Sequence, residues 1–279
     1  MLSYQHSYHA GNFADVHKHL ILSRLLEALQ RKDKPFCYFE THAGRGRYNL
    51  TEAEAQKTAE YRQGIGRLWE QAQIPDLARP YLAAIQELNP HAPLRYYPGS
   101  PAVAHRWLRD QDRMQLMELH PQEVQPLREL FRGDRRVGVH QRDGFEGVLA
   151  LTPPPEKRGL VLIDPSYELK EDYRQLPQWV DKLFQRWSSA VCAIWYPLLP
   201  QGRHQLLLRG LEQSGLRKIL VAELEVSAPG ETGMYGSGMA VVNAPWQLDQ
   251  ELEQLMPWLA AELGQDAQAR QRVTWLVPE

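Results

Sequence analysis

The sequence alternates short β-rich runs with longer amphipathic stretches, and this alternation constrains the fold more than any other feature. It is typical of βαβ units, which place helices over a mainly parallel sheet. Candidate strands lie at 35–40, 114–119, 136–142, 159–163, 190–196, 218–226, 239–243 and 273–277. Candidate helices cover 14–31, with a stripe of leucines, and 249–263. The pattern predicts an α/β fold with a twisted sheet and helices on both faces.

The interval 47–112 breaks this rhythm, because a simple crossover between parallel strands needs far fewer residues. It is helical in pattern at 52–72 and 75–88, and it ends in the turn-like Pro98-Gly99-Ser100-Pro101. We therefore expect one domain over 1–279, with a helical insertion at approximately 50–98. Such an insertion could contact a substrate or simply cover the sheet, and the sequence favours neither.

The bulk composition excludes some classes of protein. Of the 279 residues, 43% are hydrophobic and 24% charged, and the formal net charge is -2, so a nucleic-acid partner would need a local basic patch. Cys37 and Cys192 lie in apolar runs and are expected to be buried free thiols. No run approaches the ~20 apolar residues of a membrane span, and the His-rich N-terminus is unlike a signal peptide. We expect a cytoplasmic protein without membrane contact.

Four successive candidate strands end in residues suited to ligand binding. The strand 35–40 leads into Ala43-Gly44-Arg45-Gly46, whose small residues let a ligand approach the backbone. The strand 114–119 carries Glu118, which is placed to accept hydrogen bonds from a ribose. Each feature alone is equally well explained by a tight turn or by an exposed strand-end acid.

The next two strand ends complete the series. One is Asp143-Gly144-Phe145, in which Asp143 could accept from an adenine amino group and Gly144 leaves room for the base. The other is Asp164-Pro165-Ser166-Tyr167. Ligands of open α/β sheets bind at the carboxyl ends of the strands, so the four ends should meet. Their order matches that of methyltransferases that use S-adenosylmethionine.

The last strand end suits methylation of an exocyclic amine. The N6 lone pair of adenine is delocalised into the ring, so catalysis requires acceptors that draw the nitrogen toward tetrahedral geometry. The Asp164 carboxylate can accept one N6 hydrogen and the Pro165 carbonyl the other, and both stabilise the positive charge that develops. Asp164 is the expected final proton acceptor, and Tyr167 can stack on the base.

The N-terminal segment is unusually polar, with Tyr4, His6, His9, Asn12, Asp15, His17, Lys18 and His19 within its first twenty residues. No cysteine joins these residues and the spacing of a standard zinc site is absent, so we expect no metal. We interpret the segment as an aromatic and basic arm beside the pocket, able to touch phosphates and a base.

Short motifs extend from one end of the chain to the other. They are MLSYxHSxHAGNxADVxKH, THAGxGRY, LRYYPGSP, ELHP, DGF, LIDPxYE, WYP, GSGM and a closing VPE. In these motifs and their spacing the chain resembles the RlmJ family of bacterial 23S rRNA adenine-N6 methyltransferases. The resemblance implies a Rossmann-like methyltransferase fold with a helical insertion, S-adenosylmethionine as methyl donor with S-adenosylhomocysteine as product, and 23S rRNA as substrate.

The resemblance also implies roles for individual residues. It assigns a contact with the RNA to Tyr4, and it places the following residues in the cofactor pocket: His19, His42, Ser100, Glu118, Asp143, Gly144 and Asp164. Two residues depart from the family pattern, since Ser166 replaces the second proline of Asp-Pro-Pro-Tyr and Glu40 stands where Asp is common. Because Asp164 and the Pro165 carbonyl are retained, we expect activity to survive. For Glu40 we expect a contact with a water or a backbone donor.

Other functions stay open at this point. A DNA adenine-N6 or protein amide-nitrogen methyltransferase would share much of the pocket, although amide enzymes typically have Asn at position 164. A nicotinamide-dependent dehydrogenase would need a third glycine after Gly44-Arg45-Gly46 and an acid about 20 residues on, and neither is present. A non-catalytic RNA-binding protein could keep the same fold. The sequence leaves the oligomeric state open, and a monomer is plausible.

Overall fold

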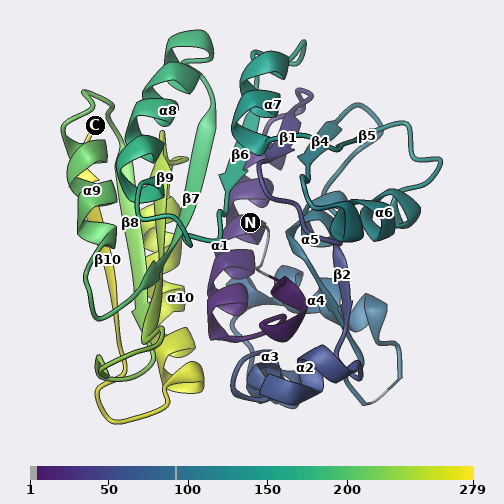
Figure 1. Ribbon diagram of the computed structural model, residues 1–279, viewed down its shortest axis with the longest axis vertical. Helices are drawn as coiled ribbons and strands as arrows, with labels where there is room; N and C mark the ends of the chain where they lie inside the picture. The colour runs from purple at the N-terminus through teal and green to yellow at the C-terminus, as the bar shows by residue number, and fades with distance from the viewer. Residues whose placement is uncertain (1–4, 92) are drawn as a thin grey trace.

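An eight-stranded sheet forms the centre of the protein, whose computed structural model describes residues 5–91 and 93–279 (Figure 1). The strand order is β10-β8-β9-β7-β6-β1-β4-β5, in which β9 and β10 run antiparallel to their neighbours and the others are parallel. The strands are β1 (Cys37–Glu40), β4 (Arg113–Met117), β5 (Val137–His140), β6 (Gly159–Ile163), β7 (Val191–Leu198), β8 (Ile219–Glu225), β9 (Gly236–Val242) and β10 (Arg270–Val277). The predicted mainly parallel α/β fold is confirmed.

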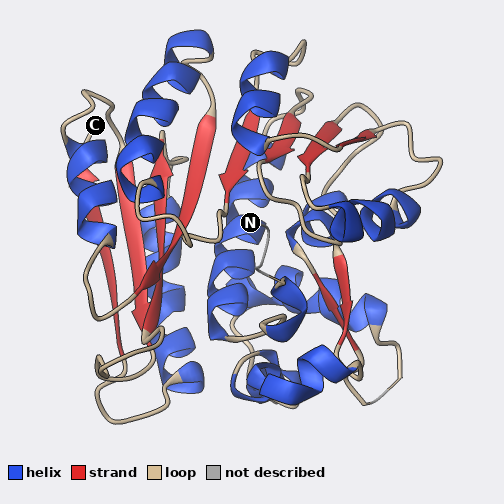
Figure 2. Cartoon of the chain, in the orientation of Figure 1, coloured by secondary structure: helices blue, strands red, loops and turns tan. Residues whose placement is uncertain are grey.

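Helices cover both faces of this sheet (Figure 2). One core contains residues of α1 (Phe13–Gln30), α5 (Ser100–His105), α6 (Pro121–Leu130) and α10 (Leu248–Leu263), and the other contains residues of α7 (Gly144–Leu151), α8 (Asp172–Arg186) and α9 (His204–Glu212). Strand β6 shows why both faces need cover. Leu160 and Leu162 belong to the first core, and Val161 and Ile163 to the second, because side chains alternate along a strand.

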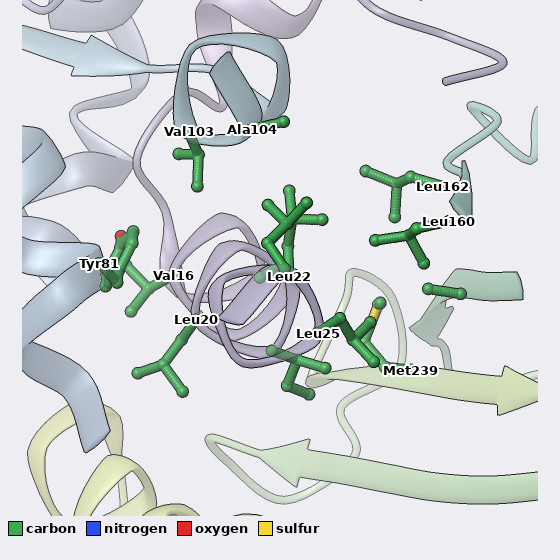
Figure 3. Close-up of a cluster of buried hydrophobic side chains, with 14 of the residues drawn as sticks. Val16, Leu20, Leu22, Leu25, Tyr81, Val103, Ala104, Leu160, Leu162 and Met239 are labelled. Carbon is green, nitrogen blue, oxygen red and sulfur yellow. The ribbon is translucent and has the colours of Figure 1, made fainter. Parts of the chain in front are cut away.

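Helix α1 lies in the interior of the first core. Figure 3 shows Val16, Leu20, Leu22 and Leu25 pointing outward in different directions from the helix axis, toward side chains of the sheet and of other helices. Each is at most 1% exposed. The sequence predicted a helix at 14–31 with a leucine stripe. The helix is confirmed, but it is buried on all sides, which a one-sided stripe does not describe.

The interval predicted to be a helical insertion lies between β2 (Arg47–Asn49) and β3 (Tyr96–Pro98), which pair as an antiparallel ribbon. It contains α2 (Ala53–Thr58), α3 (Ile65–Trp69), α4 (Arg79–Leu88) and the short 3-10 helices η2 (Glu60–Gln63) and η3 (Asp76–Ala78). The expected continuous helix at 52–72 is wrong, because Ala59 adopts a left-handed conformation that ends α2. Ser100 begins α5 and is not part of a turn. Whether these elements act as a separate unit stays a prediction.

The topology brings four strand ends to one edge of the sheet. Strands β5, β4, β1 and β6 are adjacent and parallel, so their carboxyl ends face the same way. The chain adds β4 and β5 on one side of β1, and β6 and β7 on the other. The order therefore reverses beside β1, where open α/β sheets have their ligand crevice.

Two further expectations concern the chain as a whole. Cys37 and Cys192 are buried free thiols, as predicted. Within the described ranges, no helix has both the length and the apolar character that crossing a membrane requires.

Candidate active site

A cavity of about 330 Å³ opens at the carboxyl edge of the sheet, between the ends of β1, β4 and β6 and the first turns of α1. Its wall brings together most of the residues that the sequence and the resemblance predicted for the site. These are His19, His42, Ser100, Glu118, Asp164, Pro165 and Tyr167. The fold thereby brings residues as far apart in the chain as His19 and Tyr167, 148 positions, into one pocket.

The turn after β1 and the end of β4 form one side of this cavity. Gly44 has a φ of 60°, and a Cβ there would meet the Tyr48 hydroxyl at 2.5 Å, so only glycine fits this turn. Glu118 accepts hydrogen bonds from the backbone N–H of Gly44 at 2.8 Å and of His120 at 2.7 Å. Burial raises the pKa of Glu118 against these two bonds. Each carboxylate oxygen keeps a lone pair that can accept from a ribose hydroxyl.

Asp143 and Gly144 lie one strand further along the same edge. Asp143 caps α7 by accepting from the Glu146 N–H at 2.9 Å. A Cβ on Gly144 would lie 1.9 Å from the Thr41 carbonyl oxygen, so the glycine lets α7 approach the end of β1. The described lining of the cavity does not include either residue. Their roles in cofactor binding stay predictions.

The carboxylate of Asp164 is held by a buried lysine from α1. Lys18 Nζ lies 2.5 Å from Asp164 Oδ2 and 3.0 Å from Asp15 Oδ1. The Lys18 side chain is 5% exposed and that of Asp164 is 15% exposed. Burial alone would lower the pKa of Lys18, but the carboxylates of Asp15 and Asp164 outweigh burial and raise it. Lys18 is therefore a fixed positive charge inside the cavity wall.

Asp15 anchors this lysine. Its Oδ2 accepts from the Gly11 N–H at 2.9 Å and lies 2.9 Å from His6 Nε2. Burial alone would raise the pKa of Asp15, but the nearby charges of His6 and Lys18 hold it well below its usual range. A single buried carboxylate thus ties the N-terminal segment and Lys18 to the cavity.

The two buried histidines of α1 occupy different environments. His19 Nδ1 lies 2.8 Å from the Tyr97 hydroxyl, and its Nε2 has no hydrogen-bond partner among the described residues although the residue lines the cavity. His17 Nδ1 lies 2.9 Å from Ser237 Oγ. Burial lowers the pKa of each histidine to about 3, so both are neutral at pH 7.

These positions correct the interpretation of the N-terminal segment as an aromatic and basic arm. Asp15, His17, Lys18 and His19 are all at most 4% exposed and belong to a helix in the core. These four side chains therefore do not reach the surface, where they could contact phosphates. The prediction was right that the segment lies beside the pocket, since His6, His9 and Asn12 also line it. Tyr4 lies outside the described residues.

The rest of the Asp-Pro-Ser-Tyr loop is set by packing. Tyr167 has a φ of 53° and is 6% exposed, and its hydroxyl donates to the Trp195 carbonyl at 2.6 Å. Its ring packs on Tyr173 at 4.5 Å between centroids, which fixes the ring at the cavity wall. Pro165 is buried and Ser166 is exposed. The loop therefore presents the Pro165 carbonyl and the Tyr167 ring from a rigid base.

Ser100, Glu40 and His42 complete the side of the cavity near β1. Ser100 Oγ donates to the fully buried Glu40, which also accepts from the Tyr38 hydroxyl at 2.9 Å. These donors are side-chain hydroxyls, not the water or backbone donor expected for Glu40. Burial raises the pKa of Glu40 to about 8 against these hydrogen bonds. His42 packs its ring edge-on against Phe145 at 5.4 Å between centroids.

Several cavity residues were missed at the level of sequence. Asp15 and Lys18 were expected in an arm that touches phosphates and a base, and Trp195 had no predicted role, although the wall contains all three. The signal that was available is the HAGN-x-ADV-x-KH motif, in which charged residues sit among the apolar positions of a helix. A buried charge needs a partner, so the motif indicates that these residues are paired, but it does not identify the partner.

The wall fits S-adenosylmethionine in three respects. The Gly44 turn admits a ligand close to the backbone, Glu118 offers lone pairs to a ribose, and the orphaned His19 Nε2 is a buried polar atom facing the cavity. Among the described residues, no group of three or more His, Cys, Asp or Glu side chains is arranged to hold a metal ion.

Fold and cavity together define a Rossmann-like methyltransferase that uses S-adenosylmethionine. Residues 33–277 match the family model described as "Ribosomal RNA large subunit methyltransferase D, RlmJ", and the chain belongs to this family. The predicted resemblance is confirmed.

Individual relatives agree with the family model over the whole chain. The sequence is 44% identical to "Ribosomal RNA large subunit methyltransferase J" of Escherichia coli strain K12 and 46% identical to the protein of the same name from Haemophilus influenzae, with 100% of each chain covered. The crystal structure of protein LPL1258 from Legionella pneumophila superposes with a TM-score of 0.90 at 37% identity, covering 96% of this chain and 98% of that one.

Proposed function

We propose that this enzyme transfers a methyl group from S-adenosylmethionine to the N6 atom of an adenine in 23S rRNA. The observation that carries the proposal is that two hydrogen-bond acceptors of the Asp164-Pro165 pair have no donor within the described part of the chain. Lys18 Nζ donates to Asp164 Oδ2, while no described residue donates to Asp164 Oδ1 or to the Pro165 carbonyl oxygen. Two acceptors at the cavity wall are thus left for the two hydrogens of one amino group.

The choice of RNA follows from the relatives, which are named as methyltransferases of large-subunit ribosomal RNA. In bacteria the large subunit carries 23S rRNA. Acting on this RNA places the enzyme in the cytoplasm, and the cavity lies within a single chain, so a monomer contains the whole proposed site.

Bound S-adenosylmethionine supplies an electrophilic methyl group on a sulfonium. Asp164 and the Pro165 carbonyl orient the amino group by accepting its two hydrogens, which draws the nitrogen toward tetrahedral geometry and localises its lone pair on the nitrogen. As the N–C bond forms, the bond between methyl and sulfur would break and S-adenosylhomocysteine would leave, so positive charge develops on the nitrogen next to the Asp164 carboxylate. Asp164 Oδ1 then takes the proton that the methylated nitrogen loses.

Lys18 positions this carboxylate. The ammonium group holds Asp164 Oδ2 and is itself held by Asp15, so the carboxylate has a defined orientation before substrate arrives. Tyr167 is the proposed stacking partner for the target base, and its buried hydroxyl keeps the ring in place. A base that is paired or stacked in the RNA must first be turned out of its stack.

The remaining predicted residues are proposed to hold the cofactor. Glu118 receives the ribose, and Asp143 and Gly144 lie beyond it toward the adenine end. His19, His42 and Ser100 line the wall between β1 and α1. The position of Asp164 in the same wall lets it contact the methyl-donor end as well as the substrate.

Transfer of a tritiated methyl group to 23S rRNA, duplex DNA and protein extract tests this function. Unmodified 23S rRNA should accept label, and digestion of the RNA should recover it as N6-methyladenosine. Label in DNA or protein with none in 23S rRNA would contradict the proposal. A control with 16S rRNA shows whether the large-subunit RNA is preferred.

A further inference from the structure

The outer face of the β2–β3 ribbon carries arginines that differ from most others in the same region. Nearby arginines are engaged by carboxylates. Arg45 binds Glu123 through two hydrogen bonds of 2.9 and 2.7 Å, Arg79 lies 2.8 Å from Asp76, and Arg106 lies 2.9 Å from Glu87. Such pairing satisfies the guanidinium groups within the protein and leaves them little reason to bind another anion.

Arg47 and Arg95 have no such partner. Both are exposed, and neither side chain forms an ion pair or a hydrogen bond with any described residue. Each guanidinium lies over the Tyr96 ring, at 5.4 Å from its centroid for Arg47 and 5.2 Å for Arg95. These cation–π contacts hold both arginines beside one ring and leave their guanidinium N–H groups available to bind an anion.

The ribbon places this group by simple alternation. Tyr48 and Tyr97 point inward and are 4% and 0% exposed, so Arg47 and Tyr96 are on the outer face. Tyr48 lines the active-site cavity. One face of the ribbon thus forms part of the cavity wall, and Arg47 and Tyr96 are on its other face.

A second cation–aromatic pair adjoins the first. The Arg62 guanidinium lies 5.8 Å from the Tyr61 ring centroid. Gln56 Nε2 donates both to the Tyr61 hydroxyl at 3.0 Å and to the Leu50 carbonyl at 2.5 Å, and the Leu50 N–H donates to the Arg95 carbonyl at 2.8 Å. Through Gln56 and Leu50, these bonds link the Tyr61 side chain to the backbone of Arg95.

We propose that this cation–aromatic surface, formed by Arg47, Arg95, Tyr96, Tyr61 and Arg62, binds the RNA strand that flanks the target adenine. The planar guanidinium groups contact phosphates, and the tyrosine rings offer faces for unpaired bases. The identification of the RNA as rRNA rests on the proposed function. The surface explains how a chain of net charge -2 holds a polyanion, because the cations that matter are the unpaired ones.

The test compares unpaired arginines with paired ones. The triple variant R47Q/R95Q/R62Q removes three guanidinium groups that bind no carboxylate among the described residues, and the matched control R79Q/R106Q removes two that do. Three quantities are measured for each: binding of S-adenosylmethionine by calorimetry, binding of a 23S rRNA transcript against salt concentration, and kcat and KM for methyl transfer to that transcript.

The triple variant should bind S-adenosylmethionine as the wild type does and keep its kcat. Its KM and its dissociation constant for the transcript should rise by about tenfold or more, and the slope of log K against log salt should become shallower by roughly 2. The control should match the wild type in all three measurements. This set of results supports the proposal.

Two outcomes overturn it: transcript binding by the triple variant within about twofold of wild type, or an equal loss in the control. Failure of the proposed function gives a different result, because wild type would then transfer no methyl group to the transcript. The binding isotherms still decide the role of the surface in that case, since they do not depend on catalysis.

Discussion

The two walls of the cavity are built in different ways. One wall consists of turns that follow strands of the sheet, and it carries Glu118, Asp164 and Pro165. The other wall is the first turns of α1, which carry Asp15, Lys18 and His19 inside the protein. The strand-end wall supplies acceptors for ligands, and the helix wall supplies the charge that holds one of those acceptors in place.

This difference shows where the stability of the protein and its activity are coupled. Residues on strand-end turns can face a ligand without disturbing a core. Charged and polar residues in a fully buried helix are costly unless each one finds a partner, so they tie catalysis to packing. Changes on the helix wall should therefore affect both stability and turnover. Changes on the strand-end wall should alter one of these two properties without the other.

The largest combined effect is expected for Lys18→Met. This change leaves the buried Asp15 and the largely buried Asp164 without their shared cation. The free energy of unfolding should fall by about 3–5 kcal/mol. The kcat of methyl transfer should fall by about 100-fold, because the Asp164 carboxylate loses its orientation. Chemical denaturation and single-turnover kinetics measure the two effects.

Lys170→Met is the matched control for this prediction. Lys170 is an exposed residue that follows the Asp-Pro-Ser-Tyr loop. The control should leave stability and kcat close to wild type. A Lys18→Met enzyme that kept full activity would contradict the coupling between the two walls.

A smaller effect is expected on the strand-end wall for Gly144→Ala. The added Cβ would lie 1.9 Å from the Thr41 carbonyl oxygen, so α7 must move away from the end of β1. We expect a loss of roughly 1–3 kcal/mol in the free energy of unfolding, measured by denaturation.

The control is Gly230→Ala, whose nearest atom would be 3.5 Å away and whose φ is not positive. Its stability should be unchanged. Equal stabilities of the two variants would show that the contact between Gly144 and Thr41 is not tight.

The effect that is smallest at neutral pH concerns His17, which is buried on α1 and is not among the described lining of the cavity. Burial lowers the pKa of His17 to about 3, whereas an unfolded histidine titrates near 6.5. Between these values the unfolded state binds the extra proton, so stability is fully present above pH 6.5 and is lost as the pH falls toward 3. The loss is at most about 1.4 kcal/mol per pH unit for this histidine.

His17→Gln should flatten this dependence, since glutamine can still bond to Ser237 and does not titrate. The exposed His91 provides the control, and His91→Gln should follow the wild-type profile. Thermal unfolding between pH 4 and pH 8 compares the three proteins. Parallel profiles for wild type and His17→Gln would contradict a neutral buried His17.

The strand-end wall was predictable from sequence, and the helix wall was not. Strand positions follow from β-rich runs, and parallel strands must end at one edge, so Glu118 and Asp164 could be brought together without a structure. The partner of Lys18 could not, because its pairing with Asp164 joins residues 146 positions apart and depends on how α1 crosses the sheet.

Two other features of the fold could not be predicted from the sequence pattern. The β2–β3 ribbon is too short to be distinguished from a turn by its pattern, at three residues in each strand. The predicted helix at 52–72 is interrupted at Ala59, a position where no glycine or proline signals the end of a helix. Both belong to the region where local signals are weakest and tertiary contacts decide the conformation.

The proposed mechanism depends on Asp164 as the proton acceptor for methylation of an adenine N6 atom. It is tested most directly by mass-spectrometric mapping of N6-methyladenine in 23S rRNA treated with wild type, Asp164→Asn or the control Ser166→Pro, which alters an exposed residue of the same loop. Wild type and Ser166→Pro should both produce N6-methyladenine. Asp164→Asn should slow its formation by about 100-fold or more while still binding S-adenosylmethionine. N6-methyladenine formed by Asp164→Asn at the wild-type rate would contradict the claim.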